Sequence, residues 1–334
     1  MVPASGVTGS IACNNTVFGD PLAGTTKACN YFVSSGSSSA STGSAGPFIP
    51  HHFDVVVVPA CSAFSYAAQP FGVTATARNA SNATTLNYDG TAATTPNFAK
   101  ATTLSDAVTL GVGTWSNNSI AATAFTAGVA NATPSYAFTT KTTAPQTLLV
   151  RAIDASPASS SGYAEGSTLL RSGRLKLSNA TGSERASLAI PVQAQYWSGN
   201  AWVQNSADSC SSVPAAAVVR AAYLDNKGAA ATGWTSTASA IAISAGAGTL
   251  TLGAPSPTTT GSLDFALNLG ATTTDQSCLT AHPASTAAAL PWLRSQYGSS
   301  GACGTAWDRD PSARATFGIY TPETRKNVHV RELF

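Results

Sequence analysis

The hydrophobic pattern of this chain is that of short β-strands. From Phe53 onward, apolar and β-branched residues alternate with Thr, Ser and Gly in short runs that end at Gly, Pro or Asn. In the run RLKLS, Leu175 and Leu177 are expected to face a core while Arg174 and Lys176 face water. Many short strands at this spacing are typical of β-sandwiches.

The same pattern predicts three parts. Residues 1–46 combine a disulfide-bearing N-terminal segment with a Ser/Gly-rich linker, residues 47–160 form an immunoglobulin-like β-sandwich, and residues 161–334 form a C-terminal β-sandwich. Residues 1–140 carry only three basic and four acidic residues, and this shift in charge supports a boundary near 140–165. The predicted fold class is all-β, with tandem immunoglobulin-like β-sandwiches and a short helical lid in the second.

Two local predictions refine this picture. The run between Thr280 and Tyr297 is the best helix candidate, with Ser285 or Thr286 as its cap, and it would form the lid. The run FDVVVV that begins at Phe53 is apolar on both faces, which favours a central position in its sheet.

Charge and hydropathy exclude several classes of protein. Charged residues make up 10% of the chain, and the net charge of +2 gives no cluster of basic residues for nucleic acid or anionic lipid. No apolar run reaches the roughly 18 residues that span a bilayer, and residues 1–6 do not resemble a signal peptide. Any export signal, anchor or pilin-type helix is therefore expected outside this chain.

The six cysteines predict disulfides in an oxidising compartment. They are even in number and contain no C-x-x-C or zinc-type spacing. Of the fifteen possible connectivities, Cys13–Cys29 and Cys278–Cys303 are favoured because each closes a short Gly/Ser-rich loop. Cys61 and Cys210 are then left as the remaining pair.

Asp308 and Asp310 are candidates for half of a calcium site, because calcium takes six to eight oxygen ligands. The favoured alternative is a turn whose carboxylates pair with Arg309, Arg314 or Arg325. No other cofactor is expected.

The histidines give no clear chemistry. His51 and His52 could form a metal pair, but adjacent residues in an extended chain point to opposite sides, so two linker histidines are the favoured interpretation. His282 and His329 have no neighbouring nucleophile motif, and G-x-S-x-G does not occur. No catalytic residues are expected, although an extracellular hydrolase stays open as a third hypothesis.

Trp197 and Trp202 are candidates for contact with a glycan, because sugar faces stack on exposed aromatic rings. The favoured alternative is a hairpin closed at residues 198–200, with the two rings packing across its strands.

Five motifs in order carry a resemblance to a known family. They are FDVVVVPAC with FSYAAQPF at 53–71, NYDG at 87–90, EGSTLLRSGRLKLSNATGSE at 165–184, QAQYWSGNAWVQNSADSC at 193–210, and WDRDPSARATFGIY with VHVRELF from 307 to 334. Through them the chain resembles the C-terminal region of MshQ-like proteins of the DUF6701 type, which are encoded with mannose-sensitive haemagglutinin (MSHA) type IV pili. The resemblance implies an exported, pilus-associated or adhesin-like protein with no established catalytic residues.

These observations favour a non-catalytic protein at the bacterial cell surface. Its expected partners are subunits of pili or other surface filaments, including copies of itself, with no nucleic acid and no membrane span. The alternative is a carbohydrate-binding module that uses exposed tryptophans or tyrosines.

Overall fold

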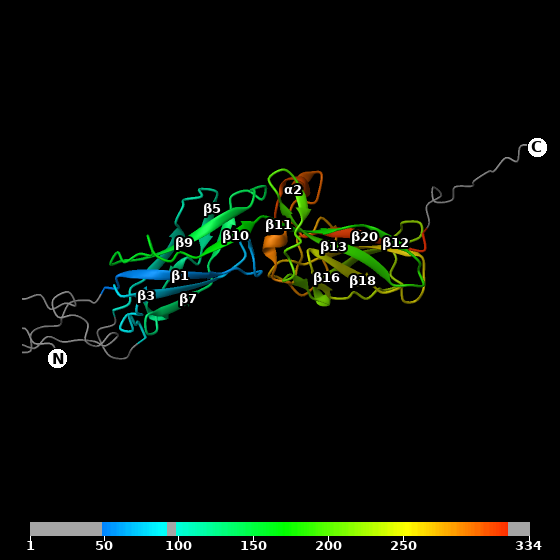
Figure 1. The fold of residues 1–334 in the computed structure, drawn as a ribbon. Helices are drawn as coiled ribbons and strands as arrows, with labels where there is room; N and C mark the ends of the chain where they lie inside the picture. The colour runs from blue at the N-terminus through cyan, green and yellow to red at the C-terminus, as the bar shows by residue number, and fades with distance from the viewer. Residues whose placement is uncertain (1–48, 92–97, 320–334) are drawn as a thin grey trace, which may run out of the picture. The chain divides into compact units, whose positions relative to one another are not determined.

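The computed structural model describes residues 49–91 and 98–319 and is nearly all β (Figure 1). The described residues fall into two compact units. Unit 1 contains the described parts of Met1–Ala60, Pro70–Ala137 and Thr147–Leu169, and unit 2 contains those of Cys61–Gln69, Phe138–Gln146 and Leu170–Phe334. The prediction of tandem β-sandwiches is confirmed.

Unit 1 is built from two main sheets and one small one. The first sheet has the order β1-β3-β7, the second contains β10, β9, β4 and β6 in that order, and β5 pairs with β8. The elements are β1 (His52–Val58), β3 (Gly72–Arg78), β4 (Thr102–Asp106), β5 (Gly113–Ser116), β6 (Ser119–Ile120), the 3-10 turn η1 (Ala122–Ala124), β7 (Val129–Ala132), β8 (Ser135–Phe138), β9 (Gln146–Asp154) and β10 (Ser167–Arg171).

Alternation along the strands creates the core of unit 1. Every second residue of β3, namely Val73, Ala75 and Ala77, is buried, and the residues between them are half-buried. Leu148 and Val150 of β9 are fully buried on the second sheet. A period of two thus gives each sheet one core face, as the sequence predicts.

The predicted central position of the FDVVVV strand is wrong. β1 lies at the end of its sheet, paired only with β3, and Val56 and Val58 are 56% and 60% exposed. Its other edge is covered by irregular chain, because the N–H of Phe53 donates to Ser159 O and that of Val55 donates to Ala164 O. Valine suits any half-buried pleated surface, so an apolar run does not identify a central strand.

Unit 2 is also a sandwich. One sheet has the order β11-β13-β14, with β18 also on β13, the other has the order β12-β20-β19-β16, and β15 pairs with β17. The elements are β2 (Ser65–Tyr66), β11 (Gly173–Leu177), β12 (Ala180–Gly182), β13 (Leu188–Trp197), β14 (Trp202–Gln204), β15 (Ser212–Val213), η2 (Ala215–Ala217), β16 (Val218–Asp225), β17 (Ile241–Ala242), β18 (Ala247–Leu252), β19 (Gly261–Leu267), η3 (Pro291–Leu293), α2 (Gly301–Thr305) and β20 (Ser312–Phe317). β2 pairs with the end of β10, through Leu170 and Arg171.

β19 is an interior strand of its sheet in unit 2 and pairs with β16 and β20. Six of its seven residues are buried, and the exception is Asp264. Leu175 of β11 is buried and Lys176 is exposed, as the alternation of RLKLS predicts, whereas Arg174 and Leu177 are both half-buried.

The predicted helix between Thr280 and Tyr297 is wrong. Apart from the single 3-10 turn η3, this run is irregular, and the short α-helix α2 lies beyond it. The N–H groups of Thr286, Ala288 and Leu290 donate to carbonyls of Ala216, Asn268 and Leu269. Those donors would be used within a helix, so pairing with distant chain replaces the helix. Ser285 Oγ accepts a hydrogen bond from Asn268 Nδ2 and does not cap a helix.

Two sequence predictions concern residues that lie outside the described ranges: the N-terminal segment 1–46 and the pairing of its cysteines Cys13 and Cys29. The predicted domain bounds stay a prediction.

Two matched valine variants test whether the face of β1 that carries Val56 is exposed to solvent. Val73→Ala, at a site 2% exposed, should lower the free energy of unfolding of unit 1 by about 2 kcal/mol because it leaves a cavity. Val56→Ala, on the neighbouring strand but 56% exposed, should change it by less than about 0.5 kcal/mol. Urea unfolding measures both, and equal losses would contradict the exposed position of Val56.

Candidate functional site

Two disulfides close in unit 2. Cys61 pairs with Cys210 across 149 residues of sequence, with their Cα atoms 5.5 Å apart, and Cys278 pairs with Cys303 across 25 residues. Both predicted pairings are confirmed. No cysteine of the described ranges is free.

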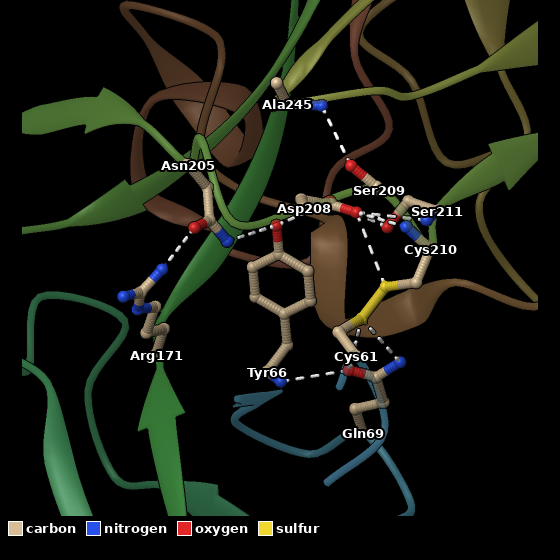
Figure 2. The surroundings of a disulfide bond; sticks show 10 residues. All are labelled: Cys61, Tyr66, Gln69, Arg171, Asn205, Asp208, Ser209, Cys210, Ser211 and Ala245. Atoms are coloured by element: carbon tan, nitrogen blue, oxygen red, sulfur yellow. Dashed lines mark hydrogen bonds between the residues drawn. A yellow bond between two sulfur atoms is a disulfide. The ribbon is translucent and has the colours of Figure 1, made fainter. Parts of the chain in front are cut away.

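A buried carboxylate lies beside the first disulfide (Figure 2). Asp208 is fully buried and accepts hydrogen bonds from Tyr66 Oη at 2.7 Å and Ser211 Oγ at 2.8 Å. The backbone N–H groups of Cys210 and Ser211 donate to its other oxygen at 3.1 and 3.0 Å. Four donors offset the desolvation of the charge, which otherwise costs several kcal/mol.

Tyr66 connects this carboxylate to the rest of unit 2. Burial, and then the negative charge of Asp208, hold the pKa of Tyr66 far above its ordinary range, so its hydroxyl stays a proton donor. The same hydroxyl accepts from Asn205 Nδ2 at 2.8 Å, and Asn205 Oδ1 accepts from Arg171. The Arg171 guanidinium also lies over the ring of Tyr196, 4.6 Å from its centroid.

Cys61, Asp208 and Cys210 also form a group whose potential metal-ligand atoms lie within 4.8 Å of one another, the one group of three or more such residues in the described chain. The two sulfurs are bonded to each other, and all the donors around Asp208 point at its oxygens. These residues therefore fit a covalent and hydrogen-bonded fastening, and they do not fit a metal centre.

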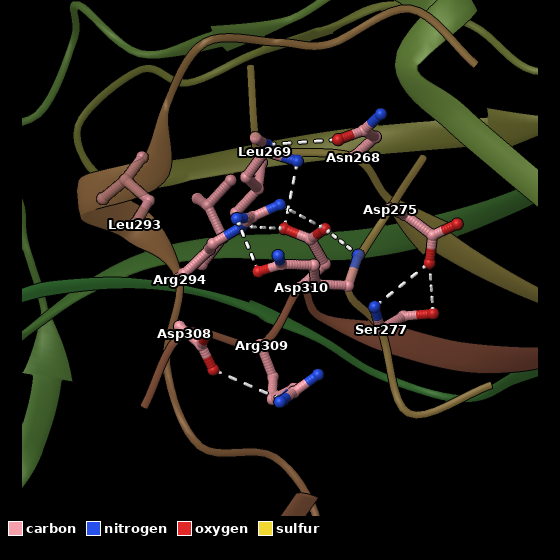
Figure 3. A network of polar contacts seen from close by, with 12 residues as sticks. Asn268, Leu269, Asp275, Ser277, Leu293, Arg294, Asp308, Arg309 and Asp310 are labelled. Atoms are coloured by element: carbon pink, nitrogen blue, oxygen red, sulfur yellow. Dashed lines mark hydrogen bonds and ion pairs between the residues drawn. The ribbon is translucent and has the colours of Figure 1, made fainter. Parts of the chain in front are cut away.

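A second buried carboxylate lies at the end of the other sheet (Figure 3). Asp310 is fully buried and accepts a bidentate ion pair from Arg294, with N–O distances of 2.7 and 2.9 Å. The N–H groups of Leu269 and Gln276 donate to it as well. A planar guanidinium matches a carboxylate in this way, so the pair joins the chain before β20 to the irregular run that follows β19.

This arrangement bears on the candidate calcium residues. The carboxylate of Asp310 already accepts four hydrogen bonds, while that of Asp308 is 63% exposed and lies 3.4 Å from Arg309. Arg309 is a partner that the sequence suggests, whereas Arg294 is one that it misses. Calcium binding at Asp308 and Asp310 stays a prediction, and at Asp310 it would require displacing Arg294.

A histidine–aspartate pair lies in the irregular run between β19 and β20. His282 Nδ1 is 3.0 Å from Asp275 Oδ2, and Ser277 Oγ donates to the same oxygen. In a hydrolase triad the serine contacts the histidine, and here both contact the aspartate. His329 lies outside the described residues.

Lys141 is a half-buried residue whose ammonium has no carboxylate contact in the described chain. Its ammonium donates to the backbone carbonyls of Trp292 at 2.5 Å and Gly173 at 3.2 Å. Burial lowers the pKa of Lys141 to about 7. The lysine holds residues 138–146 in unit 2, and no signal in the sequence marks this role.

The hairpin predicted around Trp197 and Trp202 is present. Trp197 faces Trp202 across β13 and β14, with ring centroids 5.7 Å apart in an edge-to-face arrangement. The Arg174 guanidinium lies over the Trp202 ring, 4.4 Å from its centroid. Both rings are half-buried. One face of Trp202 is thus covered, and glycan contact at this pair stays a prediction.

Comparison with known families follows the two units. Residues 23–158 match the model described as DUF6701, third domain, and residues 171–333 match DUF6701, fourth domain. The chain carries two DUF6701 domains. In the DUF6701 fourth domain lie Asp208, Asp310 and both partners of Lys141.

Comparisons outside the family add little. A search of curated proteins finds no match. Among solved structures, the adhesin InvE of Yersinia pseudotuberculosis is similar at 11% identity with a TM-score of 0.23; the match covers 64% of this chain and 54% of InvE. This chain therefore spans about half of InvE, and a likeness this low supports no inference. The described residues contain no helix long and apolar enough to cross a membrane.

Removing one hydroxyl tests the Asp208 network. Tyr66→Phe should lower the free energy of unfolding by about 2 kcal/mol, because it leaves a buried charge one donor short and removes the acceptor of Asn205. Tyr196→Phe is the control, since its hydroxyl makes no hydrogen bond to the described chain and its ring stays under Arg171. Urea unfolding compares the two, and equal effects would contradict the network.

Lys141 gives a pH-dependent prediction. Its pKa is about 7 when folded and has the ordinary value of 10.5 when unfolded, so the unfolded chain binds more protons between these values. Relative to Lys141→Met, wild-type stability should therefore rise with pH from about 7 to 10.5 and stay level below 7. The expected total is a few kcal/mol. Urea unfolding at several pH values measures it, and a difference that does not vary with pH would refute the buried ammonium.

Proposed function

We propose that this chain is a non-catalytic, extracellular surface protein that acts by binding or assembling with other proteins. The observation that carries the proposal is the use of the buried carboxylates Asp208 and Asp310 and of the half-buried Lys141. Asp208 and Asp310 each accept four hydrogen bonds, and Lys141 donates to two carbonyls. An enzyme keeps such groups available to a substrate, whereas here they join segments of the scaffold.

The disulfides support an extracellular location. They form and persist outside the cytoplasm, and both pairs join segments that are separated by loops or by whole strands. The low content of charged residues, with Ser and Thr as the main polar residues, is also consistent with an extracellular protein. A location at the cell surface accounts for both the disulfides and the low charge.

The proposed partners are subunits of pili or other surface filaments, including other copies of the chain. Support comes from the resemblance of five motifs to MshQ-like proteins and from the two DUF6701 domains. The strands of a β-sandwich form a stable scaffold that positions its surface loops, which suits a protein that binds others under mechanical load.

Deletion in the native host tests this function. Cells lacking residues 171–319 of the protein should adhere less to surfaces or to each other, and the intact protein should be digested by protease added outside whole cells. If the His282–Asp275 pair has no catalytic role, Asp275→Asn should leave adhesion unchanged. Unchanged adhesion after the deletion, or protection of the protein from external protease, would contradict the proposal.

A further inference from the structure

Two adjacent histidines converge at the start of β1. The sequence predicts that their side chains point to opposite sides, but His51 Nδ1 and His52 Nδ1 lie 3.1 Å apart. His51 precedes the strand and is exposed, while His52 is its first residue and is 1% exposed. The turn of the backbone at the strand start brings both rings to one side.

The surroundings hold both residues in place. The ring of His52 stacks on that of Tyr163, with centroids 3.7 Å apart and planes 15° from parallel. The Tyr163 hydroxyl lies 3.4 Å from His51 Nδ1. The backbone N–H of His51 donates to Arg78 O at 2.8 Å. The geometry of the pair is therefore set by two neighbouring segments of unit 1, around Arg78 and Tyr163.

The far nitrogen of His52 faces a carboxylate. His52 Nε2 lies 3.7 Å from Asp54 Oδ1, and Asp54 is held by Arg78 Nε at 2.7 Å. A carboxylate on this side favours the proton on Nε2 and leaves the lone pair on Nδ1, an arrangement that recurs behind metal-bound histidines.

We propose that His51 and His52 bind one divalent transition-metal ion through their two Nδ1 atoms. At a metal–nitrogen distance of about 2.05 Å, nitrogens 3.1 Å apart subtend an angle of roughly 100° at the ion. This lies between the about 90° of square-planar and the about 109° of tetrahedral coordination, so Cu²⁺ and Zn²⁺ both fit. Water supplies the remaining ligands, and Cu²⁺ binds more tightly than Zn²⁺.

A hydrogen bond between the rings is the competing explanation, because 3.1 Å also suits an N–H···N contact. That arrangement places a proton between the nitrogens, and a metal ion would replace it. Binding of metal by the pair therefore separates the two explanations.

The experiment titrates the whole oxidised chain at pH 7.5 with Cu²⁺, and separately with Zn²⁺, in competition with a chromophoric chelator. The expected result is one ion per chain at the pair, with two imidazole nitrogens in the electron paramagnetic resonance spectrum of the Cu²⁺ form. His51→Ala should weaken Cu²⁺ binding at least about tenfold. Its side chain is exposed, so this variant should fold, which circular dichroism checks.

His282→Ala is the matched control and should bind as the wild type does. His329 and the terminal amine are unchanged in both variants, so a loss seen only in His51→Ala assigns the ion to the pair. Equal binding by His51→Ala and wild type, or a spectrum without two imidazole nitrogens, would overturn the proposal.

Discussion

The contact between Tyr66 and Asp208, fastened by the Cys61–Cys210 disulfide, is the constraint on which unit 2 depends. Residues 61–69 lie in sequence between β1 and β3, both in unit 1, yet the Tyr66 ring is buried in unit 2. Its hydroxyl reaches a carboxylate 142 residues away. A segment this short cannot keep such a position by its own propensity, so covalent and charge-assisted bonds hold it there.

Three ionic groups of unit 2 are held by different kinds of partner. Asp310 is neutralised by a bidentate arginine, Asp208 is solvated by four uncharged donors, and Lys141 is solvated by two carbonyls. Each joins an irregular segment to a sheet or to another loop. Irregular chain has unpaired backbone groups and little apolar area, so polar fastening supplies what packing does not.

The sequence predicts the local features of the fold well and the distant contacts poorly. The Trp197–Trp202 hairpin and the alternation of β11 depend on neighbouring residues; the hairpin is confirmed, and the alternation holds at Leu175 and Lys176. The helix at 280–297 fails because Thr286 and Leu290 bond to segments remote in sequence. The central position of β1 fails because valine runs occur at edges as well as centres.

The candidate site shows the same division. The Cys61–Cys210 pair could be reached from the sequence only by elimination, and nothing there indicates its neighbours Tyr66 and Asp208. Lys141 likewise carries no motif. These roles exist only once three separate stretches of chain have come together, and a single sequence holds no record of that pairing.

The most direct test of this account is the stability of the Cys61→Ser/Cys210→Ser double variant, measured by urea unfolding beside the oxidised wild type. A crosslink that closes 149 residues restricts the unfolded chain by up to about 5 kcal/mol. The account predicts a loss of several kcal/mol, with residues 61–69 losing their protection from hydrogen exchange. A loss below about 0.5 kcal/mol, with that protection intact, would contradict it.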